Sequence, residues 1–402
     1  MLRARGIHPA NLPRLCSAPG WPAPQQPLHL FVCIADHFEP KWKRPTRQVE
    51  RQRVAEWVHG YPRSVAGLCD SHGRPPQHTF FYPIDEYDPE HLDRLARLHQ
   101  AGLADVEVHL HHDHDTAPAL REKLEGFKHT LFHRHALLGT NDQGDISYGF
   151  IHGNWALDNS RPDGRWCGVN DELTVLVQSG CYADFTLPSA PSPTQTSTVN
   201  SIYYATDDPA RPKSHDRGVA ARLGRRPPPD SLLMVQGPLA LDWSRRKWGM
   251  LPRLENAELH ATNPPTLGRL RLWIRAGVSI QGRPDWIFIK LHTHGAQEAN
   301  AAMLLGPPMR AFHEQLAAQA HRNPGWQFSY VTARELASLV HQAEADVREP
   351  AIGSKEAGPP PVDLPGDRSD FQQVLSGSRL RRAIDYGDTV RPATTGGKSL
   401  ES

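Results

Sequence analysis

Short apolar runs rich in β-branched and aromatic residues alternate along the chain with segments of helical spacing. The apolar runs predict strands at residues 28–36, 78–84, 105–111, 146–153, 182–187, 231–237, 285–294 and 327–331. The intervening segments predict helices at residues 46–58, 88–104, 117–138, 170–180, 267–278, 297–321 and 332–345. This alternation predicts a parallel sheet that is covered by helices, as in α/β proteins.

Two of these helices carry clear start signals. Asp88 suits the N-cap and Pro89 the first turn of one helix, and Thr332-x-x-Glu335 forms a capping box at the start of another. No G-x-G-x-x-G motif follows the first strand, which argues against a dinucleotide-binding fold. With about seven parallel strands and no such motif, we expect a distorted (β/α) barrel rather than an open sheet.

Changes in composition divide the chain into three parts. Residues 1–27 are rich in Pro and basic residues and predict a flexible N-terminal lead-in. Residues 28–349 carry the alternating pattern and predict one barrel domain, in which the Pro- and Ser-rich segment 188–230 forms a long loop. Residues 350–402 turn to Gly, Pro, Ser and charged residues, and predict a disordered C-terminal tail.

Histidine is the unusual feature of the composition, with 23 residues among 402, whereas the formal net charge is only +1. Imidazole is the commonest metal ligand in proteins, so the positions of these histidines matter. The near-neutral charge argues against nucleic acid or an anionic membrane as a partner. Five cysteines without a C-x-x-C pair argue against a disulfide framework or a Cys-type zinc site. With neither a signal peptide nor a membrane-spanning apolar run, we expect a cytoplasmic protein.

Polar residues gather where predicted strands end, which is the edge that carries the site in parallel α/β folds. The first strand ends in Asp36-His37-Phe38-Glu39, and a carboxylate beside an imidazole there can bind a metal or act as a base. In the segment 150–160, Gly153 permits close approach of the backbone, and Trp155 offers a flat apolar face that suits a sugar ring.

The densest group of histidines follows the third predicted strand. The segment "EVHLHHDHDT" places four imidazoles within six residues, at His109, His111, His112 and His114, and Asp115 comes next. His109 and His111 share one face of the strand, because strand side chains alternate with a period of two. Neutral imidazole is the form that binds metal, so this tract predicts a metal site.

His292 and His294 form a further pair, on one face at the end of the most apolar strand. If the sheet closes, these residues, Asp36 and the histidine tract meet around one ion. A mixed Asp/His set suits Zn²⁺ or another divalent metal, which lowers the pKa of water and polarises a carbonyl. A carboxylate and a second imidazole then transfer the protons, so we expect hydrolysis of an amide or ester.

The order of these segments resembles the polysaccharide deacetylase superfamily, the NodB-like carbohydrate esterases, over residues 28–345. In that family the first strand ends in an acidic pair that supplies a base and a metal ligand. The resemblance gives Asp36 one of these two roles in "IADHFEP". The family's metal-binding histidine pair is similar to "EVHLHHDHD", which implies His111 as the first ligand. The second ligand is Asp115 by spacing or His114 by residue type.

The later family motifs resemble "FIHGNWALD", "CYADFTLPS" and "KLHTH". The resemblance carries Asp184 over as an acid beside the site and His292 as the general acid. It implies a divalent metal, zinc or else Co²⁺, Mn²⁺ or Ni²⁺, and removal of acetyl groups from a carbohydrate or an acetylated small molecule. Residues of the same strand ends are then expected to bind the substrate, namely His37, His109, His152, Trp155 and His294.

Two other functions remain open. A non-catalytic relative would bind carbohydrate without turning it over. A different metal barrel such as an amidohydrolase also uses an H-x-H motif. In that class, however, the motif follows the first strand, whereas this first strand ends in Asp36-His37.

Overall fold

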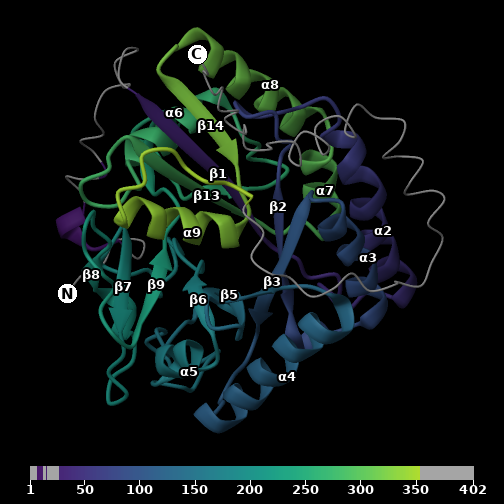
Figure 1. Ribbon diagram of the computed structural model, residues 1–402, viewed down its shortest axis with the longest axis vertical. Coiled ribbons are helices and arrows are strands. Elements are labelled where there is room, and N and C mark those ends of the chain that lie inside the picture. Colours follow the sequence, from purple (N-terminus) through teal and green to yellow (C-terminus); the bar gives the residue numbers. More distant parts are fainter. Residues whose placement is uncertain (1–6, 12–14, 16–26, 354–402) are drawn as a thin grey trace, which may run out of the picture.

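The computed structural model describes residues 7–11, 15 and 27–353, and these residues form a mixed α/β fold (Figure 1). Helices surround a large, mostly parallel sheet with the strand order β12-β13-β1-β2-β3-β5-β6-β9-β7-β8. In addition, β14 pairs with β1 and β4 pairs with β5. The strands are β1 (Leu28–His37), β2 (His78–Pro83), β3 (Ala104–Leu110), β4 (Gly139–Thr140), β5 (Ile146–His152), β6 (Cys181–Asp184), β7 (Ile202–Thr206), β8 (Val219–Ala220), β9 (Ser231–Val235), β12 (Glu258–Leu259), β13 (Trp286–Thr293) and β14 (Trp326–Tyr330).

The predicted alternation of strands and helices is confirmed, since every predicted strand and helix has a counterpart. One helix differs: the segment 297–321 forms two helices, because the chain bends at Gly306 and Pro307 starts a new helix. Asp88 and Thr332 accept backbone N–H groups as N-caps. The helices are α2 (Arg47–Ser64), α3 (Pro89–Gln100), α4 (Ala117–His135), α5 (Glu172–Gln178), α6 (Leu267–Ala276), α7 (Glu298–Leu304), α8 (Pro307–Arg322) and α9 (Ala333–Glu344).

The segment 188–230, predicted as a long loop, contains β7, a short helix (Ser214–Asp216) and β8. The strand β7 pairs antiparallel with β9, and the Tyr203 hydroxyl donates to the carbonyl of His215 at 2.6 Å. This short apolar strand was not predicted, because the Pro, Ser and Asp residues on both sides of it are typical of a loop. A second unpredicted element is the hairpin of β10 (Ala240–Lys247) and β11 (Leu251–Glu255).

Side chains of the sheet alternate between two hydrophobic cores. On β1, Val32 and Ile34 join an outer core that lies between the sheet and the helices α2 to α8. Phe31, Cys33 and Ala35 join an inner core, which includes inward-facing residues of β7, β9 and β13. Strands near both ends of the sheet therefore share one interior, so the sheet is strongly curved.

The two ends of the parallel sheet approach each other through Lys290 of β13. Its Nζ donates to the carbonyls of Phe185 and Leu187, just beyond β6, at 2.6 and 2.5 Å. Gly237, just beyond β9, lies so close that a Cβ there would be 2.4 Å from the carbonyl oxygen of Lys290. No strand pairing among the described residues joins these ends. The contact between them is made by the Lys290 side chain and by the loops that follow β6 and β9.

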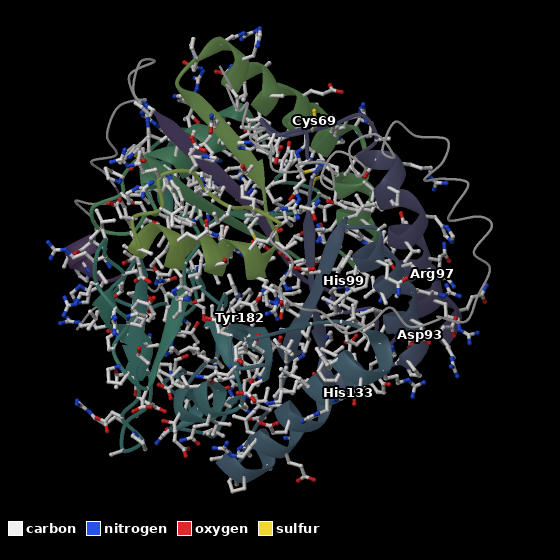
Figure 2. The ribbon with its side chains drawn as sticks, viewed as in Figure 1. Cys69, Asp93, Arg97, His99, His133 and Tyr182 are labelled. Atoms are coloured by element: carbon white, nitrogen blue, oxygen red, sulfur yellow. The ribbon has the colours of Figure 1, made fainter. Side chains whose placement is uncertain are left out.

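The helix α9 fills the inner face of the sheet at the amino-terminal ends of the strands (Figure 1). Its Leu336 and Val340 belong to the inner core. Its Arg334 lies 3.4 Å from the carboxylate of Glu107 on β3, and packs over the ring of Tyr182, the residue labelled in Figure 2. Tyr182 in turn donates its hydroxyl to Glu107 at 2.7 Å. The interior is thus packed at the amino-terminal ends of the strands.

The N-terminal region is described only at residues 7–11 and 15, where Ile7 and Leu15 pack against Val199 and Leu239. The predicted tail lies outside the described residues from position 354 onward. None of the helices in the described part of the chain combines the length and apolar character needed to cross a bilayer.

Glu107→Gln should change how stability depends on pH. Burial raises the pKa of Glu107 from 4.5 to about 7, so the folded protein holds a proton that the unfolded chain has released across this window. The free energy of unfolding should therefore fall as the pH rises from about 4.5 to about 7, by at most about 1.4 kcal/mol per unit. Urea titrations at several pH values would measure this. The free energy of unfolding should depend less steeply on pH in Glu107→Gln, and as steeply as in the wild type in the exposed control Glu122→Gln.

Candidate metal centre

Four imidazoles converge at the carboxyl ends of β1, β3 and β13. His37 ends β1, His109 lies near the end of β3, His111 follows β3, and His294 follows β13. The ring of His37 stacks on His294 at 4.9 Å between centroids and meets His109 edge-on at 5.0 Å. His109 meets His111 at 4.6 Å. Residues far apart in sequence are therefore brought together by the parallel register of neighbouring strands.

Glu39 completes this cluster, because its carboxylate reaches in from the turn after β1. Its Oε1 lies 3.4 Å from Nε2 of His109 and 3.6 Å from Nε2 of His111. Glu39 belongs to two triads whose ligand atoms lie within 4.8 Å of one another: Glu39, His109 and His111, and His37, Glu39 and His294. We call these five residues the rim cluster.

The hydrogen bonds of two histidines fix which ring nitrogen faces Glu39. Nδ1 of His109 lies 2.8 Å from the carbonyl oxygen of Ile151, and Nδ1 of His111 lies 3.3 Å from a carboxylate oxygen of Asp85. Because these oxygens can only accept, both Nδ1 atoms carry the proton, and a neutral ring then presents the Nε2 lone pair. The buried Nε2 of His109 has no hydrogen-bond partner among the described residues, although Glu39 lies beside it.

The electrostatics of the rim cluster favour a shared positive charge. Burial opposes charge on His111, but its hydrogen bonds with Asp85 and Glu39 raise the pKa of this imidazole to about 10. The contacts of Glu39 with His109 and His111 likewise outweigh burial and lower the pKa of its carboxyl group. Burial and the neighbouring His294 hold the pKa of His37 well below its ordinary value. Acceptor atoms thus face one another, and they require a proton or a metal ion between them.

The geometry of the rim cluster fits a divalent ion. Ligand atoms of a tetrahedral site with bonds of 2.0–2.1 Å lie about 3.3–3.4 Å apart, close to the separations around Oε1 of Glu39. Imidazole with one carboxylate suits Zn²⁺, and also Co²⁺, Ni²⁺ and Mn²⁺. The side chains of Glu39 and His111 remain 13% and 28% exposed, so a small molecule can reach this side of the cluster.

Trp155 and His292 border the rim cluster with unpaired polar atoms. The rings of both residues lie 6.4 Å from the ring of His37. Nε1 of Trp155 and Nδ1 of His292 are buried and have no hydrogen-bond partner in the described part of the chain. Asn154 and Trp155 also adopt φ values of 55°, a left-handed conformation that is costly outside glycine. These features indicate a wall that is shaped to contact a ligand.

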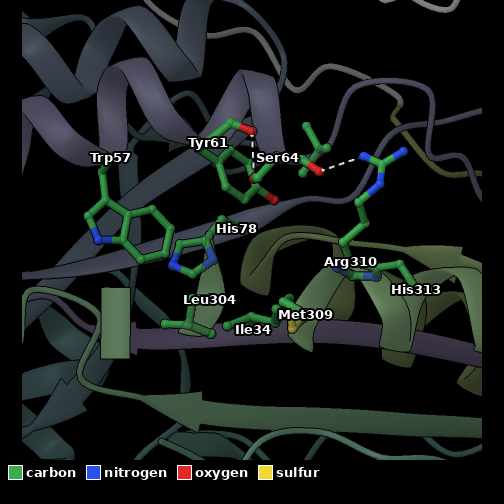
Figure 3. A pocket seen from close by; sticks show the side chains of 10 residues that line it. Ile34, Trp57, Tyr61, Ser64, His78, Leu304, Met309, Arg310 and His313 are labelled. Atoms are coloured by element: carbon green, nitrogen blue, oxygen red, sulfur yellow. Dashed lines mark hydrogen bonds between the residues drawn. The ribbon is translucent and has the colours of Figure 1, made fainter. Parts of the chain in front are cut away.

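Asp36, expected to be a metal ligand or a base, lies on the other face of β1. Its carboxylate accepts from the backbone N–H of Gly295 at 2.6 Å and pairs with Nε2 of His78 at 2.9 Å. His78 lines a cavity of about 10 Å³ between the sheet and the helices, beside Trp57 (Figure 3). Strand alternation explains this correction: Asp36 faces outward with Ile34, whereas His37 faces inward with Ala35.

The second ligand expected from the histidine tract is also placed elsewhere. His114 has a φ of 50°, and its side chain is 84% exposed beside Asp113. The carboxylate of Asp115 contacts Nδ1 of His112 at 3.1 Å and Nζ of Lys123 at 2.6 Å. The chain turns away after His111, so neither His114 nor Asp115 belongs to the rim cluster.

The remaining predicted residues divide between the rim and the interior. His37, His109, His111 and His294 meet in the rim cluster, and His292 and Trp155 border it. Asp184 instead accepts from the backbone and hydroxyl of Thr186, and burial raises its pKa to about 6. His152 points into a separate buried group with His112.

Sequence reasoning did not single out Glu39 and Asp85 as site residues. The signal for Glu39 was its position two residues after His37, which continues the inward face of β1 beyond the end of the strand. Asp85 lies in the short helix Ile84–Glu86 directly after β2, at the same edge of the sheet as His111.

The comparisons with known proteins add no family. No protein-family model matches the chain, and a search of curated proteins found no match.

Asp36→Asn should destabilise the fold without loss of an ion from the rim cluster. The amide has only one acceptor oxygen and so cannot keep the buried contacts with both His78 and Gly295, and the free energy of unfolding should fall by about 1–3 kcal/mol. Urea denaturation and metal analysis of the same samples would test this. If Asp36→Asn lost the ion while its free energy of unfolding stayed unchanged, Asp36 would be a metal ligand after all.

Gly153→Ala should weaken metal binding at the rim cluster. The added Cβ would lie 2.3 Å from Cδ2 of His111 and 2.7 Å from the carbonyl of Leu110, so the imidazole must move. We expect Zn²⁺ affinity to drop by at least about 10-fold in equilibrium dialysis, as when a partner that orients a ligand is lost. The matched control is Gly126→Ala in α4, where the new methyl group meets nothing within 4 Å.

Proposed function

We propose that the protein is a metal-dependent hydrolase that removes acetyl groups from a carbohydrate, and that its sheet is a distorted barrel like that of the polysaccharide deacetylases. One observation carries this proposal. His109 and His111, each oriented through Nδ1, direct Nε2 toward the same carboxylate oxygen of Glu39 at a partly exposed edge of the sheet. Oriented imidazoles with an accessible side are typical of catalytic rather than structural metal sites.

A divalent ion in the rim cluster would supply Lewis acidity, which activates water and polarises an acyl carbonyl. The residues of the chain then have separate tasks. Glu39, His109 and His111 hold the ion, and Asp85 keeps His111 in the required orientation. The carbonyl of Ile151 does the same for His109.

Proton transfer falls to the imidazoles that remain. Burial holds the pKa values of His37 and His292 well below the ordinary value, so both rings are neutral near pH 7 and can accept a proton. The unpaired Nδ1 of His292 is the base in this proposal. Once it carries the proton, the same group becomes the acid that serves the leaving alcohol or amine, in line with the role that the resemblance implies for His292.

Trp155 supplies the contact for the substrate in this proposal. Its indole ring borders His37 and His294, with ring centroids 6.4 Å away in each case. The ring offers an apolar face to a sugar, and its unpaired Nε1 can donate to a hydroxyl or acyl oxygen.

A second candidate function is carbohydrate binding without turnover. The orientation of Asp36 favours it, because this carboxylate pairs with His78 on the far face of β1 and cannot act as a base at the rim cluster. Glu39 is then left as the only carboxylate among the ligand atoms of the cluster.

His109→Ala should distinguish these functions, with His114→Ala as the matched control from the same histidine tract. We expect kcat/KM for release of acetate from an acetylated oligosaccharide to fall at least about 100-fold in His109→Ala, because a metal ligand is lost. His114→Ala should stay within about twofold of the wild type, because its imidazole is exposed and outside the cluster. Sugar binding by calorimetry without any acetate release from the metal-loaded wild type would contradict hydrolysis and support the binding function.

A further inference from the structure

A second group of metal-ligating side chains lies in the interior, separate from the rim cluster. It consists of His112 after β3, His152 at the end of β5, Cys167, and Glu172 at the start of α5. All four residues are buried, and the side chains of His152 and Glu172 have no exposed surface. Their ligand atoms lie within 4.8 Å of one another. We call these four residues the buried cluster.

The hydrogen-bond donors in the buried cluster do not match its acceptors. Nδ1 of His152 lies 2.5 Å from the carbonyl oxygen of Gly153, and Nδ1 of His112 lies 3.1 Å from the carboxylate of Asp115. Both Nδ1 atoms therefore donate, and neutral rings present only lone pairs at Nε2. These two Nε2 atoms lie 2.8 Å apart, and Oε1 of Glu172 lies 3.2 and 3.5 Å from them. Three acceptor atoms thus face one another when both rings are neutral.

Cys167 adds a soft ligand to the same point. Its thiol donates to Oε2 of Glu172 at 3.3 Å, and its Sγ accepts backbone N–H groups of Asn159 and Val169 at 3.2 and 3.4 Å. Burial raises the pKa of this thiol, so a metal ion at this point would displace its proton, and the two backbone donors would then stabilise the thiolate that binds metal.

We propose that His112, His152, Cys167 and Glu172 hold a second, structural metal ion, with Zn²⁺ as the best fit. Four ligands in a closed, buried site are typical of structural zinc, and imidazole, thiolate and carboxylate are its usual ligands. The tetrahedral geometry requires ligand atoms about 3.3–3.8 Å apart, so the two Nε2 atoms would separate by about 0.5 Å when an ion binds. Asp115 orients His112 and is itself held by Lys123, as an outer-shell carboxylate should be.

The position of this ion gives it a task in the fold. The segment between His152 and Glu172 contains five non-glycine residues with positive φ, a strained course for the backbone: Asn154, Trp155, Asp158, Asn159 and Trp166. Glu172 also accepts the backbone N–H of Asp158 at 2.6 Å. An ion in the buried cluster therefore holds this segment against the sheet, and with it the Trp155 wall beside the rim cluster.

Cobalt substitution tests this proposal directly. The full chain would be produced in cobalt-supplemented medium, because the closed cluster exchanges metal slowly. The wild type should show the thiolate-to-cobalt charge-transfer band in the near ultraviolet, which requires a cysteine ligand. Cys181→Ser should keep the band, since Cys181 is a buried thiol of β6 that donates to the carbonyl of Ala183 and belongs to neither metal-ligating cluster. Cys167→Ser should lose it.

Further variants keep the test decisive if Cys167→Ser does not fold. Asp115→Asn should retain the band but lose cobalt to a chelator at least about 10-fold faster than the wild type, because an outer-shell partner is removed. His109→Ala should keep the band, which separates this proposal from the hydrolase proposal for the rim cluster. A folded wild type that contains cobalt but shows no thiolate band would overturn the proposal. So would a band that persists in Cys167→Ser. Either result would leave a hydrogen-bonded His112–Glu172 pair with a neutral thiol.

Discussion

A β-strand places alternate side chains on opposite faces of its sheet, and this constraint organises the whole molecule. On β1 it sends Phe31, Cys33 and Ala35 inward and Val32 and Ile34 toward the helices. Beyond these residues the same alternation separates Asp36 from His37. On β3 it places Glu107, His109 and His111 on the same face. One row of residues therefore runs from the end packed by α9 to the rim cluster. A slip of one residue in register would exchange the two faces of the strand, and both the packing against α9 and the rim cluster would be lost.

Backbone and carboxylate acceptors fix the ring orientation of four histidines at the ends of β3 and β5. In each of four histidines, Nδ1 faces an oxygen that can only accept: Ile151 for His109, Asp85 for His111, Asp115 for His112 and Gly153 for His152. In the neutral rings the proton is thereby held away from Nε2, and the two clusters collect Nε2 atoms around Glu39 and Glu172. The clusters differ mainly in access, because one reaches solvent and the other does not.

The sequence was sufficient for the longer parallel strands and the helices between them, because buried parallel strands are apolar throughout and their helices have clear ends. It did not predict β7, β8 or the hairpin of β10 and β11. It was also sufficient to place His37, His109, His111 and His294 at one edge. It was not sufficient for the carboxylates. Asp36 is directly at the strand end, yet alternation turns it outward, whereas Glu39 reaches the site from a turn whose course only tertiary contacts determine. Cys167 was not singled out as a ligand, because nothing local in its sequence indicates His112, His152 or Glu172 as neighbours.

The packing of α9 against the inner face has a consequence for the size and direction of any ligand. With Leu336, Val340 and the Arg334–Glu107 contact filling the amino-terminal half of the interior, the described residues close that end against a ligand. A carbohydrate polymer, if it is the substrate as proposed, would therefore have to lie across the carboxyl ends of the strands instead of passing between them.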